Sequence, residues 1–335
     1  MVTSCGQLFA SHAIAQSPTS IFAPAATPAH SIFDLSMLVL SVTLGIFLVV
    51  AGLLLYALIR YRQRPEDSQH EPAQIYGSNQ IELSWTVIPI LIVVMLFLTT
   101  TRVIIGTQAI PKPKVTLNVT VIGHQFWWEY RYPDLGIVTA NELHVPVNDP
   151  AHPEPTYLTL MSADVDHSFW VPRLAGKTDL IPDHINTMWI DPQKAGVYFG
   201  QCAQYCGTQH AMMLIRVYAQ TPAEFAAWVA QQKRPVRLDF TGDPKAARGQ
   251  AVFMQNACIS CHTIAGTAAT GRFGPDLTHL ASRDTIASGA FPNTPQNLRK
   301  WVDDPNSMKP GCLMPSMHLN NRDLDAITAY LTQLR

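Results

Sequence analysis

A short motif near the C-terminus, Cys258-Ile259-Ser260-Cys261-His262, combines two thiols with an imidazole. The cysteines are one helical turn apart, so each can bond one vinyl group of a haem, and the histidine is then placed against the iron. A methionine as sixth ligand would keep the reduction potential high. Met314 is favoured because its Pro/Gly-rich loop can cross the haem face, with Met317 second and Met308 third. The motif therefore predicts a covalently attached haem c.

A second cluster of soft ligands has the pattern Cys202-x3-Cys206-x3-His210-x2-Met213. Thiolate, imidazole and thioether groups select copper over calcium or magnesium, and a single-copper blue site uses just one cysteine. Because this cluster has two cysteines, two copper ions bridged by both sulfurs are the natural extension. Such a centre needs a second imidazole, for which His167 is the best candidate. The alternative, a Cys2His2 zinc site, is disfavoured by the methionine.

The composition is typical of a protein that lies partly in a membrane. Of its 335 residues, 47% are hydrophobic and only 14% are charged. The formal net charge of -1 gives no nucleic-acid-binding signature. The six cysteines could form disulfides in an exported chain, but their local spacing in the two motifs favours thioether bonds and metal ligation.

Two apolar segments are long enough to span a bilayer, residues 35–59 and residues 85–105, the second interrupted by Arg102. Arg60, Arg62 and Arg64 follow the first segment, whereas no Lys or Arg precedes it. The positive-inside rule therefore places the connecting loop in the cytoplasm and both termini outside. We expect residues 31–107 to form a transmembrane helical hairpin.

Residues 1–30 have features of an export signal. Ala13-Ile14-Ala15 is a small-x-small triplet of the kind that signal peptidase cuts, and Cys5 resembles a lipoprotein acceptor site. Neither has the charged and apolar segments that normally precede it. We interpret this stretch as a possible signal or lipoprotein remnant.

After the second apolar segment, apolar residues recur at every second position. Val115, Leu117, Val119 and Val121 alternate with polar residues, as in a half-buried strand. Further strand-like runs lie at 125–131, 156–161, 185–190, 196–200 and 213–218. Short strands separated by Pro, Gly and Asp predict a β-sandwich over residues 108–222.

The remaining segments are predicted to be helical. Thr221-Pro222-Ala223-Glu224 has the form of a capping box, so we expect a helix to about residue 232 and a linker within residues 223–242. Asp243-Pro244 begins another helix that we expect to run into the haem motif, and a last helix starts near Arg322. Residues 243–335 would form a small all-α domain, to whose core a haem would contribute.

In this combination the chain resembles subunit II of the haem-copper cytochrome c oxidases, in the caa-type form with a fused C-terminal cytochrome c domain. The resemblance covers residues 30–335 and is carried by five motifs, Gly123–Trp128, Asp166–Ser168, Gly176–Asp179, Gly200–Met213 and Phe273–Leu277. It implies a multidomain fold: a two-helix transmembrane hairpin, an all-β cupredoxin sandwich with a binuclear CuA centre, and an all-α class I cytochrome c domain.

The resemblance also assigns individual residues. It implies CuA side-chain ligands at His167, Cys202, Cys206, His210 and Met213. The backbone carbonyl of Gln204 would be a further ligand, but many members have Glu there, whose carboxylate reaches a magnesium ion at the interface with subunit I. The uncharged Gln204 argues against that ion, although Asp179 would still belong to its region. Glu82 matches a glutamate at the mouth of a proton path into subunit I; the alternative is an ordinary helix-start glutamate.

Besides Gln204, the chain departs from the family pattern at the expected point of electron entry. Phe126 occupies the position that is often Trp where a soluble cytochrome c docks. Phe126 and the following Trp127 are candidate electron-transfer residues, and the alternative is that they are core or interface aromatics. A tethered cytochrome domain has a high effective concentration near the copper site, which would relax the demand for a docking residue.

The function implied by the resemblance is electron entry into a proton-pumping terminal oxidase. Electrons from a cytochrome c-type or membrane-bound donor would pass through haem c and CuA to the haem-copper site of subunit I, where O2 becomes water. Expected partners are subunits I and III, and the expected location is the bacterial inner membrane with both cofactor domains on the periplasmic side. The alternative is the electron-input subunit of a CuA-containing nitric oxide reductase. A copper-delivery protein would leave the haem motif and the hairpin unused.

Overall fold

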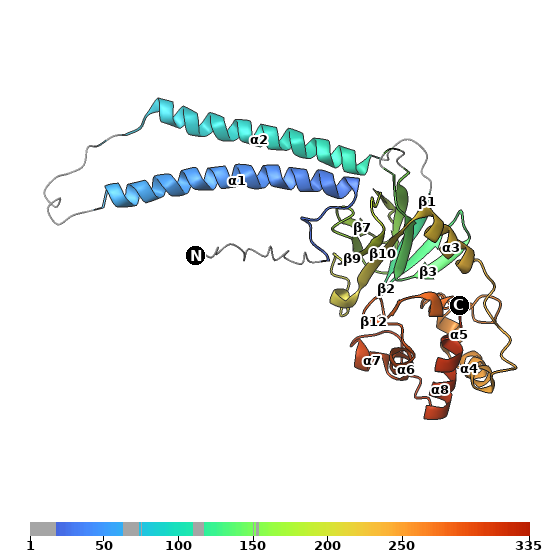
Figure 1. Cartoon of the computed structure of the whole chain (residues 1–335). Coiled ribbons are helices and arrows are strands. Elements are labelled where there is room, and N and C mark those ends of the chain that lie inside the picture. Colours follow the sequence, from blue (N-terminus) through green and yellow to red (C-terminus); the bar gives the residue numbers. More distant parts are fainter. Residues whose placement is uncertain (1–17, 63–73, 75, 110–116, 150, 152–153) are drawn as a thin grey trace, which may run out of the picture.

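The computed structural model describes residues 18–62, 74, 76–109, 117–149, 151 and 154–335. Two long helices project from a β-sandwich, and a smaller helical domain packs against the sandwich at the C-terminal end of the chain (Figure 1). The predictions for Cys5 and for the triplet at residues 13–15 lie outside the described residues, as do Arg64 and Val115.

The hairpin consists of α1 (Thr27–Arg60) and α2 (Asn79–Gln108), which lie side by side (Figure 1). Both are longer than the apolar segments predicted from the sequence, because polar residues at each end continue the helix. Both are long and apolar enough to cross a bilayer, and the apolar windows of both are unburied by the rest of the chain. This is the surface expected of helices whose partners are lipid or other membrane helices.

The start of α1 is tied to the sandwich by polar contacts. Asp191 accepts hydrogen bonds from the backbone N–H of Thr27 (2.7 Å) and from its hydroxyl (2.5 Å). The backbone N–H of Ala25 donates to the carbonyl of Arg173 at 2.8 Å. The hairpin is therefore fixed to the domain that it anchors.

The sandwich has two five-stranded sheets. The first has the order β3 (Ile137–Ala140), β2 (Trp127–Tyr132), β1 (Leu117–His124), β5 (Thr156–Ser162) and β8 (Asn186–Ile190). The second has the order β4 (Glu142–Pro146), β10 (Leu214–Gln220), β9 (Gly196–Cys202), β6 (His167–Trp170) and β7 (Thr178–Leu180). The pairs β1/β5 and β4/β10 are parallel, and the other pairs are antiparallel.

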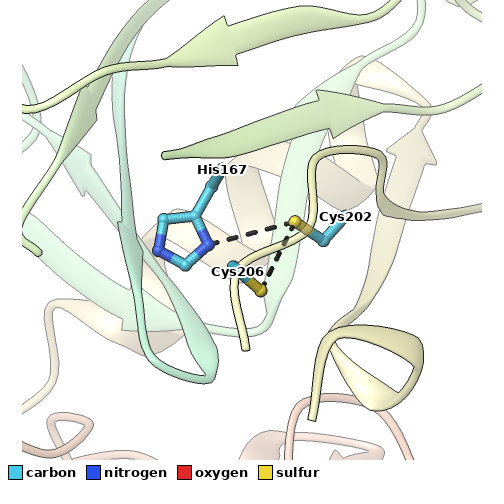
Figure 2. Close-up of side chains that lie close together, drawn as sticks. All are labelled: His167, Cys202 and Cys206. Carbon is cyan, nitrogen blue, oxygen red and sulfur yellow. Dashed lines mark hydrogen bonds between the residues drawn. The ribbon is translucent and has the colours of Figure 1, made fainter. Parts of the chain in front are cut away.

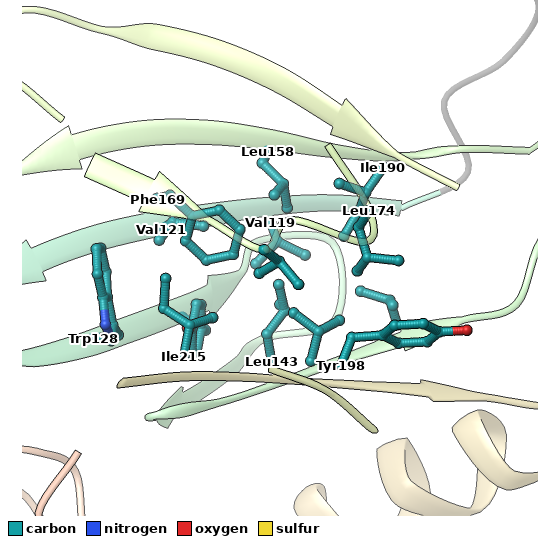
Figure 3. Close-up of a cluster of buried hydrophobic side chains, with 14 of the residues drawn as sticks. Val119, Val121, Trp128, Leu143, Leu158, Phe169, Leu174, Ile190, Tyr198 and Ile215 are labelled. Carbon is teal, nitrogen blue, oxygen red and sulfur yellow. The ribbon is translucent and has the colours of Figure 1, made fainter. Parts of the chain in front are cut away.

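Most predicted strands are confirmed to within two residues at each end. The run predicted at 125–131 begins two residues later, because residues 125 and 126 form a turn and β2 begins at Trp127. The alternating side chains of the two sheets meet in one apolar core that includes Val119, Leu158 and Phe169, each at most 1% exposed (Figure 3). Full burial stabilises by about 1.5–3 kcal/mol for each such side chain.

The capping box at Thr221 and Glu224 is confirmed at the start of α3 (Pro222–Gln232), and residues 233–242 contain no helix or strand. The C-terminal domain contains five α-helices in the described residues, α4 (Pro244–Gln255), α5 (Cys258–Cys261), α6 (Pro295–Asp303), α7 (Pro305–Met308) and α8 (Asn321–Leu331). It also contains a small hairpin, β11 (Thr285–Ile286) and β12 (Phe291–Pro292). The expectation that the first helix runs into the haem motif was wrong, because the extended backbone of Asn256 ends α4 before α5 begins.

Candidate copper and haem sites

Strand pairing brings the predicted copper ligands together. Strand β6 lies beside β9 with Phe169 opposite Cys202, so His167 at the start of β6 lies next to a cysteine thirty-five residues further along the chain. The backbone N–H of Cys202 donates to the carbonyl of Met213 at 2.9 Å, which closes the loop between β9 and β10. The other three predicted ligands, Gln204, Cys206 and His210, lie within that loop.

The ligand atoms form a continuous chain of contacts around the two sulfurs. The sulfur atoms of Cys202 and Cys206 are 3.9 Å apart (Figure 2). Nδ1 of His167 lies 3.9 Å from the Cys202 sulfur, and the Cys206 sulfur lies 3.7 Å from Nδ1 of His210 and 3.8 Å from the Met213 sulfur. The carbonyl oxygen of Gln204 is 3.2 Å from the Cys202 sulfur. The structure thus brings together every predicted CuA group, and this donor set of sulfur and imidazole suits copper.

Asp164 orients the buried histidine of this cluster. The Nε2–H of His167 donates to Asp164 at 2.8 Å, which leaves Nδ1 facing the sulfurs. Burial alone would lower the pKa of His167, but its hydrogen bonds with Asp164 and Cys202 outweigh burial and raise that pKa. Asp164 also accepts from the backbone N–H of Gln125 at 2.6 Å. The sequence analysis missed Asp164, although a carboxylate three residues before a candidate ligand was a usable signal.

The two thiols differ in acidity because they are so close. The hydrogen bond between the two thiols and the contact with His167 together lower the pKa of Cys202 to about 3. The pKa of Cys206 is raised by its hydrogen bond with Cys202, by burial and by the negative charge on Cys202. One thiol therefore ionises readily, and the thiolate is the form that binds metal. Bound cations would offset the repulsion between two thiolates.

The predicted haem ligands line one cavity between the helical domain and the sandwich. Cys258, Cys261, His262, Met314 and Met317 all contribute to its wall. Met308, the third methionine considered, does not line this cavity. The structure therefore reduces the candidates for the sixth ligand to the two methionines ranked first from the sequence.

His262 is prepared to bind a metal through one nitrogen. Its Nδ1–H donates to the carbonyl of Pro275 at 2.7 Å, which leaves Nε2 free. Burial lowers the pKa of His262, so the imidazole is neutral near pH 7. A hydrogen bond of this kind fixes the orientation of a ligating histidine.

The cavity suits a flat apolar group that carries acidic substituents. Its walls include the apolar side chains of Phe253, Val302 and Ile327. Nε of Arg283 and the hydroxyl of Ser288 also belong to lining residues, and both are buried without a hydrogen-bond partner in the described part of the chain. A haem has this combination of a large apolar ring and two carboxylates, so the residues present fit it.

The remaining predicted site residues lie in different places. Phe126 and Trp127 are each 8% exposed, and both line the haem cavity between the two domains. The ring of Trp127 stacks on His124 at 4.2 Å. Glu82 is exposed in the first turn of α2, at the end of the hairpin far from the sandwich (Figure 1). Asp179, in β7, is exposed and outside the sulfur cluster.

This fold and these two sites define a membrane-anchored electron-transfer protein with a cupredoxin-type domain and a c-type cytochrome domain. Three family models match the chain: "Cytochrome C oxidase subunit II, transmembrane domain" at residues 15–103, "Cytochrome C oxidase subunit II, periplasmic domain" at 150–220 and "Cytochrome c" at 246–335. The matched domains imply CuA copper and haem c.

Relatives match over nearly the whole chain. Cytochrome c oxidase subunit 2 of Alkalihalophilus pseudofirmus is 34% identical and covers 98% of this chain and 94% of its own length. The corresponding protein of Bacillus sp. strain PS3 is 37% identical and covers 82% and 80%, and that of Bacillus subtilis is 30% identical and covers 100% and 94%. The chain belongs to the cytochrome c oxidase subunit 2 family. It is a membrane-anchored oxidase subunit with a periplasmic domain and a fused cytochrome c domain.

Proposed function

We propose that this chain is the electron-entry subunit of a proton-pumping terminal oxidase. It would receive electrons from a cytochrome c-type or membrane-bound donor and pass them through its own haem c and CuA centre to the haem-copper site of subunit I, which reduces O2 to water. The observation that carries the proposal is that the haem cavity and the sulfur cluster are neighbours. Gln209, which precedes His210, lines the haem cavity.

Each residue of the copper cluster has a distinct task in this proposal. Cys202, Cys206, His167 and His210 would hold the two copper ions, which would supply one-electron uptake and release. The thioether of Met213 and the carbonyl of Gln204 would be the weaker ligands. Four of these six residues are at most 3% exposed, His167, Cys202, Cys206 and Met213. A dry, preformed site changes little in geometry when its charge changes, which favours fast electron transfer.

In the haem domain, Cys258 and Cys261 would hold the ring covalently, and His262 would bind the iron through Nε2. Met314 would be the sixth ligand. Arg283 is buried, and burial lowers its pKa, but a guanidinium remains charged at neutral pH. We assign it to a haem carboxylate, which would supply both a counter-ion and an acceptor for its unpartnered Nε.

The hairpin would pack against subunit I in the bacterial inner membrane, with subunit III as a further partner. Glu82 would then lie at the cytoplasmic end of α2, where a carboxylate can take up protons for a path into subunit I. Magnesium binding at the subunit I interface would have to use Asp179 without help from a carboxylate at Gln204. Both sites would be completed by the partner subunit.

The proposal is tested on the full chain, matured where haem c attachment is possible and purified in detergent. We expect two copper ions per covalent haem and an EPR spectrum in which one unpaired electron is shared by both coppers. Cys206→Ser should lose that spectrum and keep the haem. Cys312→Ser, which removes a thiol outside both motifs, is the matched control and should retain both cofactors. One copper or none in the unaltered chain would refute the CuA assignment.

A further inference from the structure

The loop that carries one copper ligand is hydrogen-bonded to the loop that carries Met314. The side-chain amide of Gln209 donates to the carbonyls of Lys309 (2.7 Å) and Pro310 (3.1 Å). Gln209 is 3% exposed and Lys309 is 2% exposed, so both bonds lie away from water. Because His210 follows Gln209 directly, a single side chain spans the distance between the two ligand loops.

A second contact reinforces the same junction. Nζ of Lys309 donates to the carbonyl of Phe126 at 3.2 Å, and the side-chain amide of the preceding Gln125 donates to the carbonyl of Cys206 at 2.7 Å. Among the described residues, no carboxylate forms an ion pair with Lys309. Burying an ammonium group in this way is costly and lowers the pKa of Lys309 to about 8. A buried, unpaired ammonium group lowers the stability of the fold, so it is expected where the group holds two segments in a required position.

The two loops are also in steric contact. Gly311 has a φ of +84°, and a Cβ atom at this position would lie 2.6 Å from Cγ2 and 3.0 Å from Cβ of Thr208. Only a glycine fits both this backbone conformation and this spacing. Residues 309–311, which lead to Met314, therefore pack against the copper loop in one fixed position.

We propose that Gln209 is the positioning residue that holds the Met314 loop on the His210 loop and so sets the rate of electron transfer from haem to copper. This inference rests on the proposed function. The transfer oxidises the haem iron by one electron and reduces the copper pair by one, and no bond or proton changes place. Trp127 is the other candidate for this positioning role, but its ring stacks on His124. Gln209 belongs to the copper loop, and its side chain is hydrogen-bonded to the Met314 loop.

The test compares Gln209→Leu, which keeps the size and removes the hydrogen bonds, with Tyr218→Phe. The Tyr218 hydroxyl donates to Asp284 at 2.9 Å, so the control also removes one hydrogen bond between the domains but lies away from the ligand loops. Haem-to-copper transfer is measured in the full loaded chain after flash reduction of the haem. We expect Gln209→Leu to slow it by about tenfold, because a Met314 loop that is no longer held on the copper loop leaves the two sites misplaced relative to each other. Tyr218→Phe should keep the wild-type rate.

Further measurements distinguish a positioning role of Gln209 from damage to the copper or haem site. The copper EPR spectrum and the haem potential should be unchanged in Gln209→Leu. Hydrogen exchange at the amides of Lys309, Gly311 and Cys312, measured in the haem-loaded chain before copper is added, should be faster in Gln209→Leu and unchanged in Tyr218→Phe. Equal slowing of transfer in both variants, or a wild-type rate in Gln209→Leu, would overturn the role of Gln209. No transfer in the unaltered chain would instead overturn the proposed function.

Discussion

Helices α4 and α8 cross at Gly249, and this crossing gives the sharpest prediction for the haem domain. A Cβ atom on Gly249 would lie 2.0 Å from the carbonyl oxygen of Ala326 and 2.8 Å from Cβ of Tyr330. Both of these atoms are held rigidly by α8, so no flexible side chain can move aside. Gly249→Ala must therefore push the two helices apart.

The size of the effect follows from these distances. An ordinary contact begins at 3.4 Å, so the carbonyl must retreat by about 1.4 Å, the difference between 3.4 Å and 2.0 Å. Overpacking of this kind costs about 1–3 kcal/mol, and the clash with backbone favours the upper end. Alanine returns about 1 kcal/mol through its higher helix propensity. The net loss should be about 1–2 kcal/mol.

The assay is thermal unfolding followed through haem absorbance, together with the yield of covalent haem. For a domain of this size, a loss of 1 kcal/mol lowers the melting temperature by about 4–8 °C. Haem yield should also fall, because Phe253 of α4 and Ile327 of α8 line the cavity. Gly242→Ala is the control, since nothing lies within 4 Å of its added Cβ. Equal melting temperatures for Gly249→Ala and the wild type would refute the packing argument.

Three other predictions use the same protein. Burial lowers the pKa of His144 in the folded protein to about 4. The free energy of unfolding should therefore fall as the pH drops from about 6.5 through 4, by up to about 3 kcal/mol. His144→Gln should flatten this part of the melting-temperature profile against pH; an unchanged slope would count against it. Met314→Ala should lower the haem potential in redox titration and Met317→Ala should not; the reverse result would exchange their roles. Trp127→Ala should slow haem-to-copper transfer after flash reduction, and an unchanged rate would exclude its ring.

The parts of the site that were predictable from the sequence are those set by local spacing. Cys202, Cys206, His210 and Met213 lie in one loop between paired strands, so any fold that forms β9 and β10 brings them together. His167 was found because it is an imidazole that follows a predicted strand in the same domain. The hairpin was predictable because a bilayer requires long apolar helices.

Other features depend on contacts that no local pattern records. Strands β6 and β7 are four and three residues long, too short for their alternation to show. Asp164 acts through the orientation that it gives His167. Lys309 reads as an ordinary surface lysine in sequence, and it becomes buried only because the helical domain packs on the sandwich.

That packing also changes how the fused cytochrome domain should be understood. Glu142 of strand β4 accepts hydrogen bonds from the backbone N–H of Asp284 (3.2 Å), and from the N–H (2.8 Å) and hydroxyl (2.6 Å) of Thr285. Burial raises the pKa of this carboxylate, and these bonds offset part of that effect. The segment that it holds includes Arg283, whose side chain lines the haem cavity. A residue of the copper domain therefore positions the polar wall of the haem site. A freely tethered domain would depend on effective concentration to meet its acceptor, whereas this interface fixes both cofactor sites in one unit.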